Sequence, residues 1–354
     1  MSYQDGWAAL NLEMPDRVPR TEYSVDGYHF ALMRRVTGIP VTAESPAQER
    51  LRAAQAFRKA WAFDFAWSTL IANQIYKGFC TNMGHASYAA AGSDYDDALY
   101  CPFEDPEDVL AFDPWEAYGP IDLADMTRQF EEHYRANAAA YPDEVNMTGI
   151  YTTLMSGLIA VFGWDMLLMA CGMDGQAFGE MANRYASWMQ QFMQALAEAD
   201  VPCVMIHDDI VWTSGPFIHP DWYRKYLFTN YKKYFAPILE SGKKLIYTSD
   251  GNYTQFIDDI TATCVNGFVL EPCTDMRYIA EKYGKTHAFI GNADTRILLS
   301  GTPEEIRAEV KRCMDIGKSC PGFFLAVGNH IPANTPVENC LIYEEAYREM
   351  CRRR

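Results

Sequence analysis

The chain of 354 residues carries a formal net charge of −17 and is 49% hydrophobic. This acidic balance argues against a nucleic-acid partner, because phosphate binding needs clustered Lys and Arg side chains. The N-terminus lacks the basic and apolar blocks of a signal peptide, and no apolar run reaches the length of a membrane span. The ten cysteines are scattered without a CxxC pair. We therefore expect a cytoplasmic protein with reduced thiols and no membrane segment.

The first third of the chain predicts two strands among helices. In chain order the expected elements are a short helix at 4–10, a strand at 17–23, helices at 26–35 and 45–60, and a strand at 63–67. Residues 73–123 then combine a small, aromatic and Gly-rich stretch with an acidic stretch that contains several prolines. This composition is typical of a long loop. We expect residues 73–123 to be a lid-like insertion over the active end of the domain.

The rest of the chain alternates helices with short apolar strands. We expect a helix at 121–140, a strand at 145–151, and helical segments over 163–199 with a break near 171–173. Five apolar runs follow, and most of them are succeeded by a helical pattern; they lie at 201–207, 244–247, 267–270, 287–290 and 323–327. The helix after Thr302 starts with a capping residue, a proline and two acids. The total is eight strands in one domain.

Polar residues follow directly at the end of each late strand. His207 ends the run at 201–207, and Asp250, Glu271 and Asn329 stand just beyond later runs. In a parallel barrel, catalytic side chains gather where the strands end. The pattern therefore predicts a TIM (β/α)8 barrel, preceded by a short helical extension, with its site at the carboxyl ends of the strands.

Several short segments resemble the uroporphyrinogen decarboxylase superfamily. YTSDGN at 247–252 resembles its HSDGN or HSCGN turn, and DIVWTSGPFIHP at 209–220 resembles its D…GPF-SP segment. IGNADTRILLSGTPEEIRAEVKRC at 290–313, NHIPANTPVEN at 329–339 and PDRVPR at 15–20 fit further blocks of the family. The resemblance is scattered over most of the chain, is dense from Cys203 onward, and implies a TIM barrel.

Two departures separate the chain from the best-known branches of this family. The arginine-rich segment with which uroporphyrinogen decarboxylases grip substrate carboxylates is missing at 20–24. In the thiol-methylating branch, a His-x-Cys pair and a later Cys bind zinc, and these positions are Thr248, Asp250 and Asn329 here. The resemblance then implies the branch of corrinoid-dependent methyltransferases, and within it an O-demethylase acting on a small methoxylated compound, for which an aromatic ring is expected.

The site predicted on this basis combines acids, imidazoles and an aromatic wall. Asp250, Glu271, His330 and His207 suit a zinc ion with an open position for a substrate oxygen. Without a metal, Glu271, Asp250 and His207 would act as acid–base groups. The residues expected to bind substrate are His85, Asn252, Asp208, Asn329 and Trp212.

Ordinary structural roles compete with each of these assignments. His207 also suits a hydrogen bond to a backbone carbonyl, and Asp250 suits a turn. His330 lies in a loop next to Asn329, and a lone Cys273 is more often a small buried side chain. One of Asp208 and Asp209 is expected to orient a histidine.

The expected partners are a separate cobalamin-binding protein and a small methyl donor, and the family resemblance implies a homodimer. One alternative is a decarboxylase of a smaller acid, which would need a cationic grip from Arg17, Arg20, Arg277 or Arg296. Another is a ligand-binding barrel without catalysis.

Overall fold

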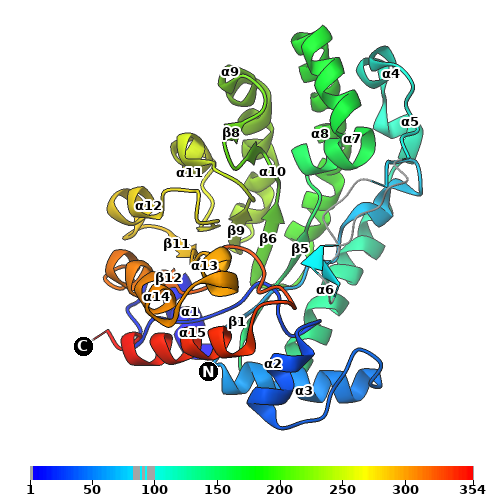
Figure 1. The fold of residues 1–354 in the computed structure, drawn as a ribbon. Coiled ribbons are helices and arrows are strands. Elements are labelled where there is room, and N and C mark those ends of the chain that lie inside the picture. The colour runs from blue at the N-terminus through cyan, green and yellow to red at the C-terminus, as the bar shows by residue number, and fades with distance from the viewer. Residues whose placement is uncertain (1–2, 83–87, 90–91, 94–99, 354) are drawn as a thin grey trace.

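The computed structural model describes residues 3–82, 88–89, 92–93 and 100–353 (Figure 1). Its strands are β1 (Phe65–Ala66), β2 (Tyr88–Ala89), β3 (Gly92–Ser93), β4 (Val145–Asn146), β5 (Thr148–Ile150), β6 (Cys203–His207), β7 (Val211–Trp212), β8 (Gly215–Pro216), β9 (Lys244–Thr248), β10 (Gly267–Val269), β11 (Ala288–Ile290) and β12 (Phe323–Phe324). The longer α-helices are α1 (Tyr3–Leu10), α2 (Phe30–Thr37), α3 (Ala47–Ala60), α6 (Leu123–Ala140), α7 (Met155–Met173), α8 (Gly175–Glu198), α10 (Phe228–Glu240), α12 (Met276–Tyr283), α14 (Pro303–Gly317) and α15 (Val337–Met350). The shorter helices are η1 (Asn73–Tyr76), α4 (Pro106–Ala111), α5 (Pro114–Tyr118), α9 (Pro220–Trp222), the π-helical η2 (Tyr223–Leu227), η3 (Thr254–Phe256), α11 (Ile257–Thr261) and α13 (Thr295–Ser300).

Parallel strands form the centre of the molecule. Six of them pair in the order β5, β6, β9, β10, β11, β12, and β1 pairs with β4 in the same parallel sense. Figure 1 shows these strands surrounded by helices that include α8, α10, α12 and α14. Because β4 and β5 follow each other along one extended segment, β1 continues the series on the β5 side.

A further extended segment at residues 18–21 joins the two ends of this series. On one side it bonds to the chain just beyond β12, since Thr21 N–H donates to Leu325 O (3.1 Å) and Leu325 N–H donates to Pro19 O (2.9 Å). On the other side Asp64 N–H donates to Arg20 O (2.7 Å), immediately before β1. The eight predicted strands are therefore all present in a parallel arrangement, and the TIM-barrel prediction is confirmed.

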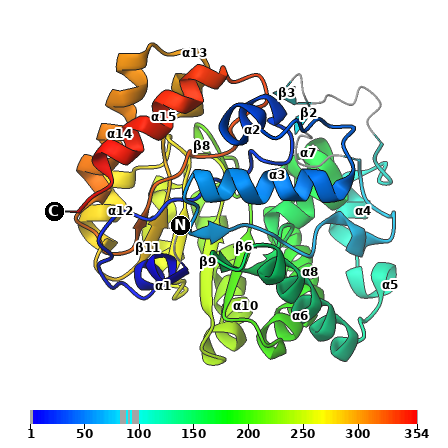
Figure 2. The same cartoon turned by 90° about the horizontal axis from the view of Figure 1, so that it is seen from below.

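The barrel interior is an apolar core closed from below by α1. Alternate side chains of the strands point inward and form one cluster with residues of α1; its members are Ala9, Leu10, Phe65, Val145, Met147, Cys203, Met205, Ile246, Val269, Ala288, Ile290, Phe324 and Ala326. Helix α1, visible from below in Figure 2, approaches so closely that a Cβ on Gly6 would lie 2.5 Å from Asp64 O. The predicted N-terminal helical extension is thus confirmed. It covers the lower end of the barrel core.

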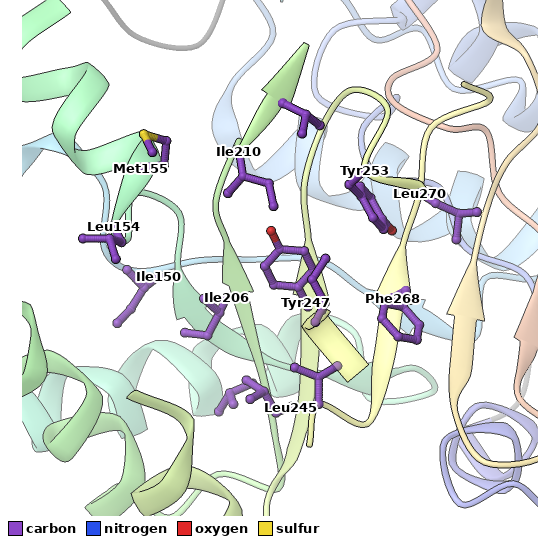
Figure 3. Close-up of a cluster of buried hydrophobic side chains, with 14 of the residues drawn as sticks. Ile150, Leu154, Met155, Ile206, Ile210, Leu245, Tyr247, Tyr253, Phe268 and Leu270 are labelled. Atoms are coloured by element: carbon purple, nitrogen blue, oxygen red, sulfur yellow. The ribbon is translucent and has the colours of Figure 1, made fainter. Parts of the chain in front are cut away.

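The intervening side chains of the same strands point outward into a second core. Ile206 on β6, Leu245 and Tyr247 on β9, and Phe268 on β10 are fully buried beneath the helices (Figure 3). This two-residue alternation explains why the strands read as continuous apolar runs, since both faces are covered. It also fixes the inward direction of His207, which has the same parity as Cys203 and Met205 on β6.

The long helical region 155–198 differs in detail from its prediction. The break near residue 173 is confirmed, because Asp174 ends α7 and caps α8 through Gln176 N and Ala177 N. The first helix begins earlier than predicted, at Met155, and contains a non-helical residue at Gly163 (φ 72°). Among the described residues, α7 alone is long and apolar enough to cross a membrane, but more than half of that stretch is buried here. It packs against α4 and α8 as a core helix.

The described parts of the predicted insertion 73–123 include η1, α4 and α5, and α4 and α5 pack against α8. A lid over the barrel remains a prediction, since residues 83–87, 90–91 and 94–99 lie outside the described residues. At the other end of the chain, α14 starts as predicted: Thr302 and Glu305 form a reciprocal capping box ahead of it, with Pro303 at its first position.

Candidate active site

The polar strand ends converge at the carboxyl-terminal end of the barrel, called the mouth below. His207 is the last residue of β6, Asp250 follows β9 by two residues, and Glu271 follows β10 by two. Asn329 and His330 lie in the loop after β12. Because parallel strands end on the same side, these residues from four βα units are brought to one place.

His207 is held rigidly in this layer. Its ring is 1% exposed and stacks on Tyr151, with ring centres 4.2 Å apart and planes 7° from parallel. Nδ1 lies 2.8 Å from Tyr151 O, and Nε2 lies 3.2 Å from Asp209 Oδ1. Burial alone would lower the pKa of His207, but the charges of Asp209 and Asp250 outweigh it and raise that pKa to about 9. The imidazole is therefore a cation in the metal-free protein.

Asp209 and Asp250 are neighbours across the β6 and β9 strand ends. Asp209 Oδ1 accepts a hydrogen bond from Asp250 N–H (2.8 Å). Burial, followed by the charge of Asp209, raises the pKa of Asp250 above its usual range, and His207 counteracts this only in part. Two acidic side chains thus share one imidazolium, and Asp250 keeps its proton to a higher pH than an ordinary carboxyl group.

Glu271 completes the acidic side of the mouth. One of its oxygens accepts from Gly251 N–H (2.9 Å), and the other accepts from the Asn329 side-chain amide (2.7 Å). The same amide also reaches Asp250 Oδ2 (3.3 Å), so Asn329 bridges the two acids. Gly251 has φ +80°, and a Cβ there would lie 2.7 Å from Val211 O. Only glycine therefore fits this turn and presents its N–H to Glu271.

Asp208, which the sequence predicted to bind substrate, has a structural role in the fold. Its carboxylate is completely buried and accepts hydrogen bonds from Met155 N–H (3.0 Å), Ser156 N–H (2.6 Å) and the Tyr231 hydroxyl. These donors occupy both oxygens and tie β6 to the first turn of α7. The neighbouring Asp209 is the one that faces His207, as expected for one member of the pair.

The other predicted binding residues occupy varied positions. Asn252 accepts from Thr254 N–H (3.1 Å) and so stabilises its own turn. Trp212 is 45% exposed and forms an aromatic group at the rim with Trp164 and Phe217, with ring centres 5.0 to 5.6 Å apart. His85 lies outside the described residues.

His330 meets the Tyr23 ring edge-on at 5.9 Å. Tyr23 also stacks on Trp67 at 5.1 Å, and its hydroxyl points into the barrel to within 3.4 Å of Met205 Sδ. Burial raises the pKa of Tyr23 well above its usual range, with Tyr151, Asp250 and Asp209 adding to the effect. Sequence reasoning missed Tyr23, Trp67 and Tyr151 as site residues, although each stands at the end of a predicted strand.

One group of side chains in the described structure has the spacing of a metal site. The candidate ligand atoms of His207, Asp209 and Asp250 all lie within 4.8 Å of one another. Glu271 and His330, two of the four predicted ligands, are not part of this group. The structure therefore brings His207 and Asp250 together and adds Asp209 to them.

Comparison with known proteins places this barrel in a family. The model of the family described as "Uroporphyrinogen decarboxylase (URO-D)" matches residues 115–350, which is more than half of the chain. The chain belongs to the uroporphyrinogen decarboxylase family. Curated uroporphyrinogen decarboxylases of Syntrophotalea carbinolica and Carboxydothermus hydrogenoformans are 27% and 24% identical over 165 and 175 residues. These alignments cover 46% and 49% of this chain, and 46% and 48% of the two relatives, so they span about half of each protein.

A solved structure similar to this member of the uroporphyrinogen decarboxylase family is a methyltransferase from Methanosarcina mazei. It matches 97% of this chain and 96% of its own chain, with a TM-score of 0.65 at 17% identity. At this identity the likeness supports the shared barrel fold.

The arginines considered as a grip for an acidic substrate are mostly engaged elsewhere in this uroporphyrinogen decarboxylase relative. Arg17 pairs with Asp64 at the lower end of the barrel (2.5 Å). Arg20 is completely buried and pairs with Glu22 (3.1 Å), outside the mouth. Arg296 is largely exposed and bonds to Asp294 in its own turn (2.6 Å). A uroporphyrinogen-type polyacid would thus meet the acids of the mouth without Arg17 or Arg20.

Proposed function

We propose that this protein is a methyltransferase component that transfers a methyl group from a small methoxylated aromatic compound to a cobalamin carried by a partner protein. The observation that carries the proposal is the mouth itself, where the acidic side chains Asp250 and Glu271 converge with His207. Such a site suits protonation of a leaving oxygen better than recognition of a polycarboxylate. The fold shared with a methyltransferase over nearly the whole chain agrees with this choice.

In the proposed reaction the methyl carbon exchanges its bond to oxygen for a bond to the cobalt of the reduced corrinoid. The electron pair of the broken bond stays on oxygen, which must gain a proton or an equivalent positive charge. Asp250 holds a proton more readily than an ordinary carboxyl group, because burial and Asp209 raise its pKa. Glu271 lies on the other side of the Asn329 amide and offers a second carboxyl group. Both acids are placed to stabilise the leaving phenolate or alkoxide.

A zinc ion is part of the proposal, since an imidazole with nearby carboxylates is a donor set that zinc accepts. When bound, the ion would polarise the ether oxygen and make it a better leaving group. For the donor itself, Tyr23 and Trp67 on one side and the Trp212 group at the rim provide flat walls that suit an aromatic ring.

The test supplies the protein with reduced cobalamin and a panel of uncharged methoxylated aromatics. Visible absorbance follows the formation of methylcobalamin, and mass spectrometry follows the demethylated phenol in equal amount. Release of CO2 from small carboxylic acids without methyl transfer would replace the proposal by the decarboxylase alternative. Stoichiometric binding without any turnover would favour a non-catalytic barrel.

Glu271→Gln sharpens this test. We expect turnover to fall by about 100-fold or more, the usual cost of losing a general acid, while the fold persists because a glutamine oxygen still accepts from Gly251 N–H. The same substitution at Glu281, an exposed residue of α12, is the matched control and should leave turnover unchanged. Full activity of Glu271→Gln would remove Glu271 from the mechanism.

A further inference from the structure

We propose that His207, Asp209 and Asp250 form a binding site for a divalent metal ion with nitrogen and oxygen ligands. This site differs from the set that the sequence predicted, because Asp209 replaces Glu271 and His330 as a ligand. It also differs from the thiolate site of the family's thiol-methylating branch, with which it shares only the position of Asp250. The inference rests on the proposed function for the role of the ion, but its location follows from geometry alone.

The first argument is the distance between the two best-placed ligand atoms. His207 Nε2 and Asp209 Oδ1 are 3.2 Å apart. Two ligands of a tetrahedral zinc ion, each about 2.0 to 2.1 Å from the metal, lie about 3.4 Å from each other. The pair therefore already has the separation of two zinc ligands. A carboxylate oxygen of Asp250 lies within 4.8 Å of ligand atoms of both residues.

The second argument is the orientation of the imidazole. His207 Nδ1 lies 2.8 Å from the carbonyl oxygen of Tyr151, an acceptor, so Nδ1 must carry a hydrogen. Nε2 then faces the Asp209 carboxylate. The lone pair of an unprotonated Nε2 would repel that carboxylate, so a proton or a metal ion has to lie between the two atoms. A backbone carbonyl that fixes the other ring nitrogen is a common arrangement behind metal-bound histidines. Stacking on Tyr151 holds the ring in this orientation.

The third argument comes from an inward-facing oxygen next to this group. Thr248 pairs with His207 in the sheet register and is 3% exposed. Its Oγ1 is buried next to the Tyr23 hydroxyl, which interacts with it and is also close enough to Asp250 and Asp209 to feel their charges. These two hydroxyl oxygens offer polar atoms to a water molecule that the ion would carry.

Glu271 is less suited to be a ligand because it lies outside the group of mutually close ligand atoms and has its own hydrogen-bond donors. Gly251 N–H and the Asn329 amide each donate to a different oxygen of Glu271. This leaves Glu271 beside the ion, facing the same space, where it can transfer a proton to or from a substrate. In this arrangement the residues at the ends of β6 and β9 would bind the metal ion, and Glu271 at the end of β10 would transfer the proton.

The experiment measures Co2+ binding, since cobalt replaces zinc in such sites and its visible absorption reports the number and kind of ligands. Titration of the metal-free wild-type chain should reach one Co2+ per chain, with equal occupancy by Zn2+ in elemental analysis. Asp209→Asn should weaken binding by about 100-fold or more, whereas its oxygen can still accept from Asp250 N–H and preserve the turn. Glu271→Gln and His330→Gln are the matched controls and should bind Co2+ as the wild type does.

A proton NMR spectrum of the Co2+ protein gives a readout that does not depend on the acidic variants. The Nδ1–H of a coordinated His207 should appear as a strongly shifted, exchangeable resonance, and His207→Gln should lack it. The proposal is overturned if Asp209→Asn binds Co2+ like the wild type, or if Glu271→Gln loses the ion. Metal binding at this site without methyl transfer would refute the proposed function alone, and methyl transfer by a chain that binds no Co2+ or Zn2+ would refute the metal site alone.

Discussion

Two buried groups of charges in this barrel differ in how well their charges are compensated. The first, called the seam cluster, lies where residues 18–21 meet the chain beyond β12 and consists of Arg20, Glu22 and Glu344. The second, called the mouth cluster, consists of His207, Asp209 and Asp250. Both clusters are buried, and the loss of hydration of their charged groups costs free energy. The two clusters differ in whether oppositely charged groups nearby offset this cost.

In the seam cluster every charge has a counterpart. The Arg20 guanidinium pairs with both glutamates and lies over the rings of Trp61 (4.4 Å) and Tyr343 (4.9 Å). Glu344 has a second partner in Arg348, and Glu22 also accepts from a backbone N–H. Nothing in this arrangement is left to bind a ligand. The cluster holds the first and last strands of the barrel together.

In the mouth cluster the acidic side chains outnumber the basic one. Asp209 and Asp250 face a single imidazole, and Glu271 adds a third carboxyl group nearby. The raised pKa of Asp250 is the electrostatic cost of this imbalance, caused first by burial and then by Asp209. Strain of this kind is found at functional sites, where a ligand relieves it. A compensated buried cluster thus indicates structure, and an uncompensated one indicates function.

The largest expected effect comes from breaking the seam cluster. Arg20→Met leaves Glu22 and part of Glu344 buried without their cation, and we expect a loss of about 3 to 5 kcal/mol in the free energy of unfolding. Urea denaturation of the metal-free protein measures it. The double variant Arg20→Met, Glu22→Gln should recover part of the loss, because it removes one orphaned charge. A loss below about 1 kcal/mol for the single variant would show that this cluster is not a structural element.

A smaller effect separates two adjacent residues, Asp208 and Asp209. Asp208→Asn turns an amide towards Met155 N–H or Ser156 N–H and should cost about 1 to 3 kcal/mol of stability, the penalty for an unpaired buried group. Asp209→Asn removes both a repulsion of Asp250 and an attraction to His207, and its oxygen can still accept from Asp250 N–H, so the stability of the metal-free protein should change by less than about 1 kcal/mol. Urea denaturation with a chelator present compares the two. Equal losses would contradict the division into a structural and a functional carboxylate.

Sequence reasoning found most of the barrel because two-sided burial makes each late strand a continuous apolar run with a polar end. His207, Asp250 and Glu271 were predicted at the mouth for that reason, and the structure places them there. The sequence did not show which of Asp208 and Asp209 faces the mouth, because the alternation of inward and outward side chains ends with the strand. The conformation of the following turn decides which carboxylate faces inward. Arg20 was a candidate for binding substrate carboxylates. Its place in the alternation of inward and outward side chains on the first strand directs it outward to Glu344, a partner 324 positions away. Contacts of that range leave no local signal.

The smallest expected effect tests a neutral histidine against the cationic His207. His29 is 2% exposed; its Nδ1 accepts from Leu32 N–H (3.4 Å), and its Nε2 lies 2.9 Å from Thr335 O, to which it donates. A protonated ring would lose the first bond, and burial lowers the pKa of His29.

Because the folded-state pKa of His29 is depressed below the unfolded value of about 6.5, its contribution to stability is present above that pH and is lost as the pH falls below it. Urea denaturation between pH 7.5 and about pH 5 should show a steeper decline for the wild type than for His29→Gln, whose amide can form the same two bonds without titrating. His207, whose pKa is displaced in the opposite direction, cannot produce this decline. Identical pH profiles for wild type and His29→Gln would mean that the acid sensitivity of the fold arises from other groups.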